Sequence, residues 1–445
     1  MILLPFFSRD ELPLSRFLDS YAASGTLRAH MPGHKGRALA GDDALAAAYA
    51  RDITEIRGAD SLFEADGILR DGEAATAALY GSGGCCWSAG GSTLCIQAML
   101  ARMRAEGRTV IAARTVHRAF LNACVLLGLR VEWVFPEAGG LVSGTYAPAA
   151  FAAALDAAAA RGERACVYVT SPDYLGHRQD IAALAAICHA RGARLLVDDA
   201  HGPHLAFLET NVHPIALGAD FCCDSAHKLL PALTGAAVLH CRDAADAAPA
   251  KQAMVLFGST SPSYLILRSI EQSMAWLAGD GAARVKETAA TAEALRRALP
   301  QYDWIGEEPF HLTAACDGLA LADDLRAAGV ECEYADGTAC VLLLSPCMTD
   351  AELTSLRDIL AGLTPRPPRA VPALPSPPRR ILPMREAALA PCDLLAPMDA
   401  IGRVCGAVQV PCPPAVPLLV SGEQVDEAWA ALYTAYGIET IAVVG

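Results

Sequence analysis

The sequence has fewer basic than acidic residues, and it has few aromatic residues. Lysine and arginine together number 35 against 49 acidic residues, a formal net charge of −14. General nucleic-acid binders carry a basic surface that meets the phosphate backbone, so this balance argues against nucleic acid as a partner. Aromatic residues make up only 6% of the chain. Much of the apolar content is alanine instead, which predicts many closely packed helices.

Long apolar runs and paired cysteines are also missing. The run Met1–Phe7 is far too short to span a membrane, and no cationic, apolar signal sequence opens the chain. The 16 cysteines form no CxxC pair, and the neighbours Cys85–Cys86 and Cys222–Cys223 suit neither a disulfide framework nor a zinc site. We therefore expect cysteines used as small apolar residues in a reducing cytoplasm, with no membrane partner and no metal.

What is present is an alternating pattern from about residue 75 to residue 260. Short apolar runs are followed by stretches rich in alanine and leucine, which predicts an α/β fold with a mostly parallel sheet. Ligands in such sheets bind at the carboxyl ends of the strands. The expected elements are strands at 109–112, 130–135, 165–170, 194–198 and 219–223, and helices at 119–127, 149–160 and 181–190.

The 445 residues suit one large domain with smaller parts around it. Eight of the 28 prolines fall within residues 365–383, which predicts an extended segment there. A weak helix is expected at 392–408 and a short strand at the end of the chain. The predicted parts are an N-terminal arm (1–75), a large α/β domain (76–300), a small α+β domain (301–364), and a proline-rich linker with a C-terminal segment (365–445).

Two predicted strand ends carry the residues that suggest chemistry. Asp198 ends an apolar strand, and Lys228 follows the next expected strand thirty residues later. A lysine in such a place forms a Schiff base, binds phosphate or is an exposed loop residue. The order of aspartate and then lysine fits pyridoxal 5'-phosphate (PLP), because a carboxylate holds its pyridine nitrogen protonated and a lysine takes its aldehyde.

Two further elements fit the same cofactor. Ser92 and Thr93 follow a pair of glycines at the start of a helical run, where backbone N–H groups and hydroxyls can bind a phosphate. The same sequence is also a common helix cap. His117 follows another expected strand and could stack on the cofactor ring, although a lone histidine is more often structural.

Together these elements resemble the Orn/Lys/Arg decarboxylase family, which are PLP-dependent enzymes of fold type I, in its compact form. The resemblance covers roughly residues 5–430. Further segments that match the family are Met31-Pro-Gly-His-Lys-Gly36, Asp52-Ile-Thr-Glu55, Thr170-Ser-Pro-Asp-Tyr174, Ser225-Ala-His-Lys228 with Leu230-Pro-Ala-Leu-Thr234, Ser259-Thr-Ser-Pro-Ser-Tyr264, Arg385-Glu-Ala387 and residues 411–423.

The resemblance implies an aspartate aminotransferase-like large domain that binds PLP, and it implies a role for each matching residue. Lys228 is expected to form the Schiff base, Asp198 to pair with the pyridine nitrogen, and His227 to contact the cofactor or the substrate carboxylate. His117 is expected above the ring and Ala200 below it. The remaining predicted cofactor contacts are Ser92, Thr93, His201, Ser225 and Thr260.

The implied reaction is decarboxylation of arginine, lysine or ornithine to an amine and CO2, as in polyamine synthesis, with Lys228 or His227 donating the proton. In the family a Ser or Thr of a second subunit completes the phosphate site, and Thr260 or Ser261 matches it, so a homodimer or larger homo-oligomer is expected. The alternatives are another fold-type I reaction, such as an aminotransferase or an elimination lyase, and a PLP-binding protein without turnover.

The sequence leaves open which of arginine, lysine and ornithine is the substrate. A basic side chain needs an acidic subsite, and the candidates are Asp173, Glu386 and Glu423. The sequence departs from the family where Cys412 replaces an aromatic residue and Ser421 replaces a proline. Both departures lie in the C-terminal part that is expected to shape the substrate entrance.

Overall fold

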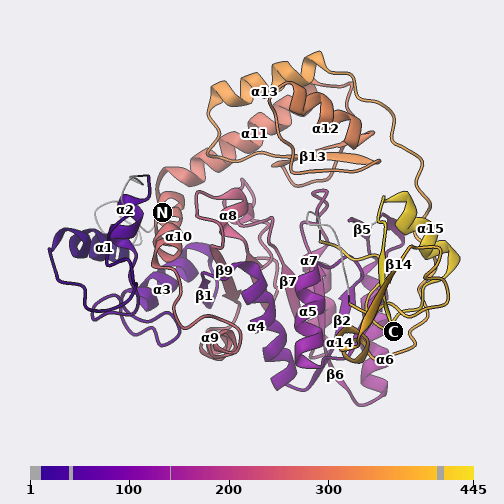
Figure 1. Ribbon diagram of the computed structural model, residues 1–445, viewed down its shortest axis with the longest axis horizontal. Coiled ribbons are helices and arrows are strands. Elements are labelled where there is room, and N and C mark those ends of the chain that lie inside the picture. The colour runs from indigo at the N-terminus through magenta and orange to yellow at the C-terminus, as the bar shows by residue number, and fades with distance from the viewer. Residues whose placement is uncertain (1–11, 40–43, 141, 408–414) are drawn as a thin grey trace. The chain divides into compact units, whose positions relative to one another are not determined.

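The chain, drawn from its N-terminus to its C-terminus in Figure 1, divides into two compact units. The first unit comprises Met1–Arg102 and Leu196–Glu287, and the second comprises Met103–Leu195 and Thr288–Gly445. This computed structural model describes residues 12–39, 44–140, 142–407 and 415–445. Among the described helices, none is both long and apolar enough to cross a membrane. The predicted domain boundaries stay predictions.

The main sheet has seven strands in the order β1-β9-β8-β7-β6-β2-β3. The β7–β8, β2–β6 and β2–β3 pairs are parallel, and β9 pairs antiparallel with both β1 and β8. The mostly parallel α/β sheet predicted from the alternating pattern is therefore confirmed. The strands are β1 (Gly84–Ser88), β2 (Arg108–Ala113), β3 (Val131–Val134), β6 (Arg164–Thr170), β7 (Arg194–Asp198), β8 (Phe221–Asp224) and β9 (Ala237–Cys241).

The strands β7 and β8 of the first unit are buried along their length. Leu195, Leu196 and Val197 have no exposed surface, and neither do Phe221 and Cys222. Such continuous apolar runs are typical of parallel strands that are covered on both faces. The helices of the first unit are α1 (Pro13–Ala23), α2 (Ala46–Arg51), α3 (Ile68–Tyr80), α8 (Ala226–Leu229), α9 (Ala247–Val255) and α10 (Tyr264–Trp276), while α4 (Gly91–Ala105) and α11 (Ala282–Ala298) cross the boundary between the units.

Within the first unit, a buried carboxylate fastens the N-terminal helix α1. Glu271 of α10 has no exposed surface and accepts hydrogen bonds from the backbone N–H groups of Leu14 and Ser15, each at 2.8 Å. The hydroxyl of Ser15 donates a third bond at 2.7 Å. These donors would otherwise be unsatisfied at a helix N-terminus, so one side chain both caps α1 and binds it to α10.

Three helices of the second unit lie within one residue of their predicted bounds at 119–127, 149–160 and 181–190. α5 starts after His117, whose ring Nδ1 accepts the Ala119 N–H at 3.1 Å, and it stops at Gly128 in the left-handed conformation (φ 61°). Glycine is favoured there because it lacks a Cβ. The helices are α5 (Arg118–Leu127), α6 (Pro148–Ala160), α7 (Ile181–His189), α12 (Gly318–Ala327), α13 (Asp350–Gly362), α14 (Met384–Leu389) and α15 (Glu427–Ala435).

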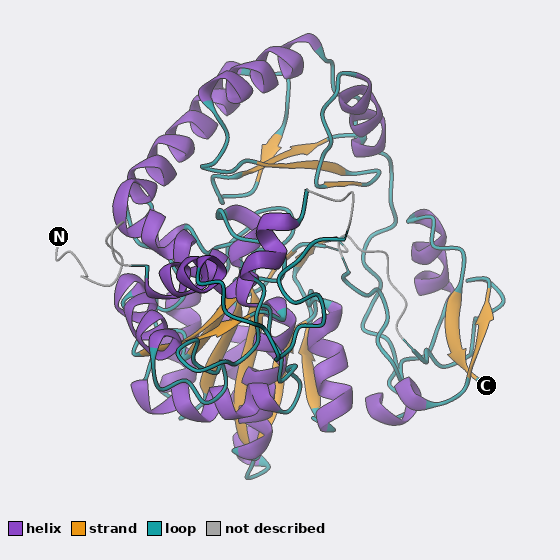
Figure 2. Ribbon diagram, turned by 60° about the vertical axis from the view of Figure 1, so that its left-hand side comes forward, coloured by secondary structure: helices purple, strands orange, loops and turns teal. Residues whose placement is uncertain are grey.

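A second, four-stranded sheet in the order β10-β11-β13-β12 has α12 and α13 over one face (Figure 2). Thr349 and Glu352 cap each other's backbone N–H groups at the start of α13, a reciprocal capping box. Between residues 309 and 362 the elements follow in the order strand, helix, strand, strand, helix. The strands are β10 (Trp304–Ile305), β11 (His311–Ala315), β12 (Tyr334–Ala335) and β13 (Ala339–Leu343).

The expected helix at 392–408 is wrong. Cys392–Leu395 forms the strand β14, which pairs antiparallel with β15 (Ile441–Val444) near the end of the chain. The partner strand lies almost fifty residues further along the chain. The pairing with this distant strand overrides the local helix propensity, and no local pattern in the sequence reveals it.

The proline-rich stretch 365–383 contains no helix, as predicted. A short two-stranded pair, β4 (Ala138–Gly139) with β5 (Gly144–Thr145), completes the second unit.

A buried ion pair fastens the C-terminal segment within the second unit. The Arg114 guanidinium donates to both carboxylate oxygens of Glu423, at 3.0 and 2.7 Å, and to the carbonyl of Leu418 at 2.8 Å. The Val420 N–H donates to Glu423 at 2.8 Å, and the two ionic side chains are only 4% and 3% exposed. Two-point contacts of this kind are the strong ones for arginine.

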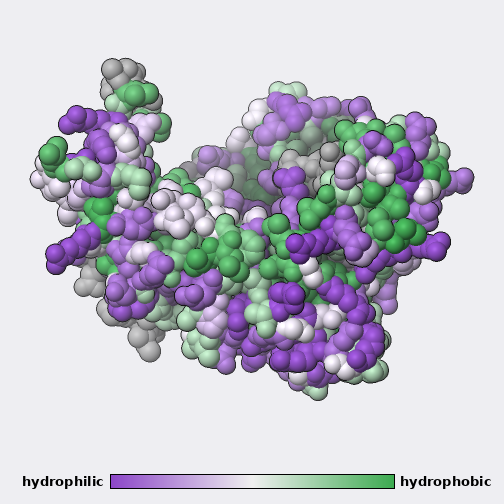
Figure 3. All heavy atoms as spheres, turned by 60° about the horizontal axis from the view of Figure 1, so that its bottom comes forward, coloured by the Kyte–Doolittle hydropathy of each residue, from purple (hydrophilic) through white to green (hydrophobic). Residues whose placement is uncertain are grey.

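Hydrophilic residues cover much of the face drawn in Figure 3, with patches of apolar residues between them. The large apolar side chains with substantial exposure include Leu126, Leu256, Leu389 and Met398. Such exposure is normal for single residues on a soluble surface.

We expect Glu423→Gln to lower the free energy of unfolding by about 3–5 kcal/mol, because it leaves the Arg114 charge buried without its partner. Urea denaturation followed by circular dichroism measures the change. The matched control is Glu331→Gln, which breaks the exposed pair with Arg326 and should leave the denaturation midpoint where it was. Equal midpoints for Glu423→Gln and the wild type would contradict the anchoring role.

Candidate active site

The candidate site lies at the carboxyl ends of β7 and β8 in the first unit. The two strands are parallel, and Asp198 at the end of β7 is in register with Cys223 of β8. The Asp198 carboxylate is 2% exposed and accepts the Ala200 N–H at 3.3 Å. It also lies 3.6 Å from the thiol of Cys223. The structure thus buries this carboxylate, and burial strengthens its interaction with a pyridinium.

Lys228 reaches one of the residues that follows β7. Its Nζ lies 2.9 Å from Nε2 of His201, which is 4% exposed. Lys228 is part of the single-turn helix α8 that begins directly after β8, so the two strand ends deliver the amine and the imidazole to one place. An amine that is half-buried against a buried imidazole can exchange a proton with it.

Two hydroxyls meet at the start of α4. Ser225, fully buried, donates to Oγ of Ser92 at 2.9 Å. The turn before α4 is ordered by Ser88, whose hydroxyl accepts the Gly90 N–H and donates to the Gly91 carbonyl. Gly91 has a left-handed backbone (φ 68°) that other residues rarely adopt. Hydroxyls at the N-terminus of a fifteen-residue helix suit a phosphate group.

The other predicted site residues differ in their exposure and in the unit to which they belong. Ala200 is 8% exposed beside Asp198, and Thr93 is exposed on the first turn of α4. His227 lies next to Lys228, with Nδ1 at 3.0 Å from the Ala236 carbonyl, and burial lowers its pKa. Thr260 is exposed in the loop between α9 and α10. His117 belongs to the second unit, where it caps α5.

The residues of the first unit fit PLP. A lysine, a buried carboxylate and a pair of hydroxyls at a helix N-terminus are the three contacts that its aldehyde, its pyridine nitrogen and its phosphate need. The strand order and these three contacts together define a PLP-dependent enzyme of fold type I.

Comparison with known proteins narrows the class. The family described as "Orn/Lys/Arg decarboxylase, major domain" matches residues 12–314. The chain is 26% identical to arginine decarboxylase of Halalkalibacterium halodurans over 94% of this chain and 92% of that protein. It is 25% identical to arginine decarboxylase of Bacillus subtilis, over 94% and 92%. Among solved structures, lysine decarboxylase LdcF of Francisella novicida superposes with a TM-score of 0.82 at 17% identity, over 97% of this chain and 81% of that one.

The chain belongs to the Orn/Lys/Arg decarboxylase family. The family, the fold class, the PLP dependence and the assignment as a decarboxylase of basic amino acids, all expected from the motifs, are thereby confirmed. The roles of individual site residues stay predictions.

Two of the carboxylates expected to bind a basic side chain are engaged elsewhere in the second unit. Glu423 holds Arg114, as described above. Asp173 is 2% exposed and accepts bonds from the Ser143 hydroxyl and from two backbone N–H groups, and burial raises its pKa. Glu386, in contrast, is exposed in the first turn of α14.

Of the two residues at which the sequence departs from the family, Ser421 is buried, and Cys412 lies outside the described residues.

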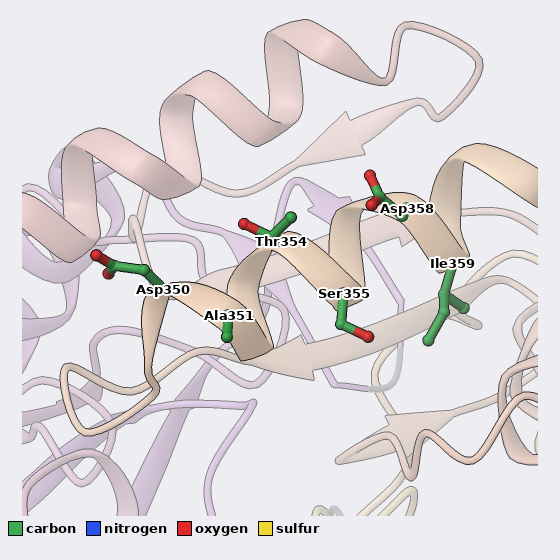
Figure 4. A pocket seen from close by; sticks show the side chains of 6 residues that line it. All are labelled: Asp350, Ala351, Thr354, Ser355, Asp358 and Ile359. Atoms are coloured by element: carbon green, nitrogen blue, oxygen red, sulfur yellow. The ribbon is translucent and has the colours of Figure 1, made fainter.

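A surface hollow follows α13, and the residues that line it all come from that one helix (Figure 4). They are Asp350, Ala351, Thr354, Ser355, Asp358 and Ile359.

Sequence reasoning missed one group of residues near the site. Asp224 precedes Ser225 directly, is 1% exposed and lies 3.2 Å from ring nitrogens of both His213 and His240. Burial alone would raise the pKa of this carboxyl, but the two histidines lower it. The feature of the sequence that could have identified Asp224 is its position at the end of a predicted strand.

We expect Lys228 to carry PLP. Borohydride reduction of the PLP-loaded protein, followed by digestion and mass spectrometry, should place the pyridoxyl group on Lys228. Lys251 serves as the internal control because its Nζ is ion-paired with the buried Glu73. A label on Lys35, Lys251 or Lys286 in place of Lys228 would overturn the assignment.

Ser225→Ala should raise the dissociation constant for PLP about tenfold or more, because it removes a hydroxyl expected to donate to a charged phosphate. Equilibrium dialysis read by the absorbance of PLP measures the change. Ser355→Ala, an exposed serine of α13, should bind PLP like the wild type. Unchanged binding by Ser225→Ala would remove this residue from the phosphate site.

Proposed function

We propose that the protein decarboxylates L-arginine, with Lys228 as the residue that carries PLP and His201 as its proton partner. The observation that carries the proposal is the 2.9 Å contact between Lys228 Nζ and His201 Nε2, beside the buried Asp198 carboxylate. Arginine is the first candidate among the basic amino acids because relatives that match over more than nine-tenths of this chain bear the name arginine decarboxylase.

PLP, when bound, supplies an electron sink that accepts the electrons of the Cα–carboxylate bond as CO2 leaves. Asp198 would accept a hydrogen bond from the protonated pyridine nitrogen, and the burial of this carboxylate would strengthen the interaction. The hydroxyls of Ser92 and Ser225 would bind the phosphate.

Lys228 and His201 act together in the proposed proton transfer. The free amine of Lys228 would deliver a proton to Cα of the substrate after CO2 has left, and His201 Nε2, 2.9 Å from that amine, would resupply the proton. His227 is the less suitable donor of the two histidines, since its Nδ1 is already 3.0 Å from the Ala236 carbonyl.

A homodimer in the cytoplasm is part of the proposal. Thr260 and Ser261 are exposed in the loop between α9 and α10. Ser261 also lines a cavity of about 210 Å³ together with Phe63, Gly90 and Gln97, all in the first unit. The exposed hydroxyls support a role at the phosphate site of a second subunit, which the family resemblance assigns to this segment.

The decisive test is CO2 release and amine formation from L-arginine, L-lysine and L-ornithine by the purified, PLP-loaded protein. We expect agmatine and CO2 from arginine, no product with Lys228→Ala, and a lowered rate with a shifted pH profile for His201→Gln. Release from lysine or ornithine instead would change the substrate but keep the reaction. Bound PLP without CO2 from any of the three would sink the proposal in favour of an aminotransferase or an elimination lyase.

A further inference from the structure

Four potential metal ligands meet in the interior of the first unit, outside the contacts assigned to PLP. They are Asp199, His213, Cys222 and Asp224, and their ligand atoms all lie within 4.8 Å of one another. Each of the four residues is at most 1% exposed. The spacing of these residues along the chain matches no common zinc motif, which is why the sequence alone predicts no metal.

The strands β7 and β8 bring these side chains to one point. Cys222 and Asp224 are two residues apart on β8, and side chains at that spacing point to the same face of a strand. Cys223 between them points the other way, toward Asp198. Asp199 follows the last residue of β7, and its N–H is bonded to the Cys223 carbonyl at 3.0 Å. His213 enters from the loop before β8.

The five distances that involve His213 or Cys222 are close to those of a tetrahedron around one ion. With zinc bonds of about 2.0–2.1 Å to N or O and about 2.3 Å to S, tetrahedral geometry puts N and O atoms about 3.4 Å apart and S about 3.6 Å from either. His213 Nε2 lies 3.3 Å from Asp224 Oδ1 and 3.4 Å from Asp199 Oδ2. Cys222 Sγ lies 3.5 Å from Asp224 Oδ1, 3.8 Å from Asp199 Oδ2 and 3.9 Å from His213 Nε2.

The surroundings would keep water away from such an ion and would orient one of its ligands. The ring of Tyr80 packs against His213 and His240, with centroid separations of 5.2 and 4.5 Å, and its hydroxyl donates to the Pro203 carbonyl. His240 Nε2 lies 3.2 Å from Asp224 Oδ2. A second imidazole in contact with a ligating carboxylate is a common outer partner in metal sites.

The charges of these side chains also favour a bound cation. Two carboxylates buried side by side repel each other, and taking them out of water costs several kcal/mol each unless cations compensate them. A divalent ion within the four ligand atoms would neutralise both carboxylates and would let Cys222 bind as a thiolate. The mixed set of sulfur, nitrogen and oxygen suits zinc better than the hard cations magnesium or calcium, which take oxygen ligands.

We propose that Asp199, His213, Cys222 and Asp224 bind one Zn²⁺ ion, and that the ion is structural. All four positions are filled by protein groups, so no position remains for a substrate or a reactive water. Binding displaces the thiol proton of Cys222 and any proton on His213 Nε2 to solvent, with no change of oxidation state. The ion would tie the end of β7 to β8, directly beside Asp198 and Ser225.

Metal analysis of untagged protein, produced in zinc-supplemented medium and purified without chelator, tests the proposal independently of the PLP chemistry. Elemental mass spectrometry should find about one zinc ion per chain, as a closed four-ligand site predicts. Cys222→Ser and His213→Gln should lose most of that zinc. The matched control is Cys223→Ser, on the same buried strand but the opposite face, which should retain it.

A cobalt-substituted sample supplies a readout that reports the ligands directly. Protein produced with Co²⁺ should show a thiolate-to-cobalt charge-transfer band in the near ultraviolet, and this band should be absent from Cys222→Ser. Substoichiometric metal in the wild type, with no change of its melting temperature when zinc or a strong chelator is present during refolding, would overturn the proposal even if a variant failed to fold. Zinc that persists unchanged in Cys222→Ser would do so as well.

Discussion

The parallel pairing of β7 with β8 is the constraint on which the candidate site depends. Because the two strands run in the same direction, their carboxyl ends meet, and each end presents polar residues directly after a fully buried apolar run. Asp198 and Ser225 come from these ends, and Lys228 follows one helical turn later. A sheet with the opposite strand direction would separate the carboxylate from the amine.

The same strand ends carry two clusters of polar side chains on their two faces. On one face Asp198 lies near Cys223 and the residues assigned to PLP, and on the other Cys222 and Asp224 meet Asp199 and His213. Alternation along β8 separates the clusters, since neighbouring residues of a strand point in opposite directions. Order in the second cluster therefore contributes to order in the first, because both depend on the same short stretches of backbone.

Two buried carboxylates of this protein are each surrounded by hydrogen-bond donors. Glu271 accepts three bonds that cap α1, and Glu423 is bonded by Arg114 and by a backbone N–H. Buried carboxylates without such partners would be strongly destabilising. In both cases a single side chain connects segments more than two hundred residues apart, and this is how the N-terminal helix and the C-terminal segment are each held within their own unit.

The sequence by itself determined the alternating α/β core and the family, and it predicted Lys228 and Asp198 as the leading site residues, because strand and helix periodicity and closely spaced motifs are local properties. Only the tertiary structure decided that Cys392–Leu395 is a strand, that Glu423 pairs with Arg114, and that His201 lies against Lys228. It also decided that Asp199, His213, Cys222 and Asp224 converge. Each of these depends on a partner that is distant in the chain, and no local pattern encodes the distance between two side chains that the fold brings together.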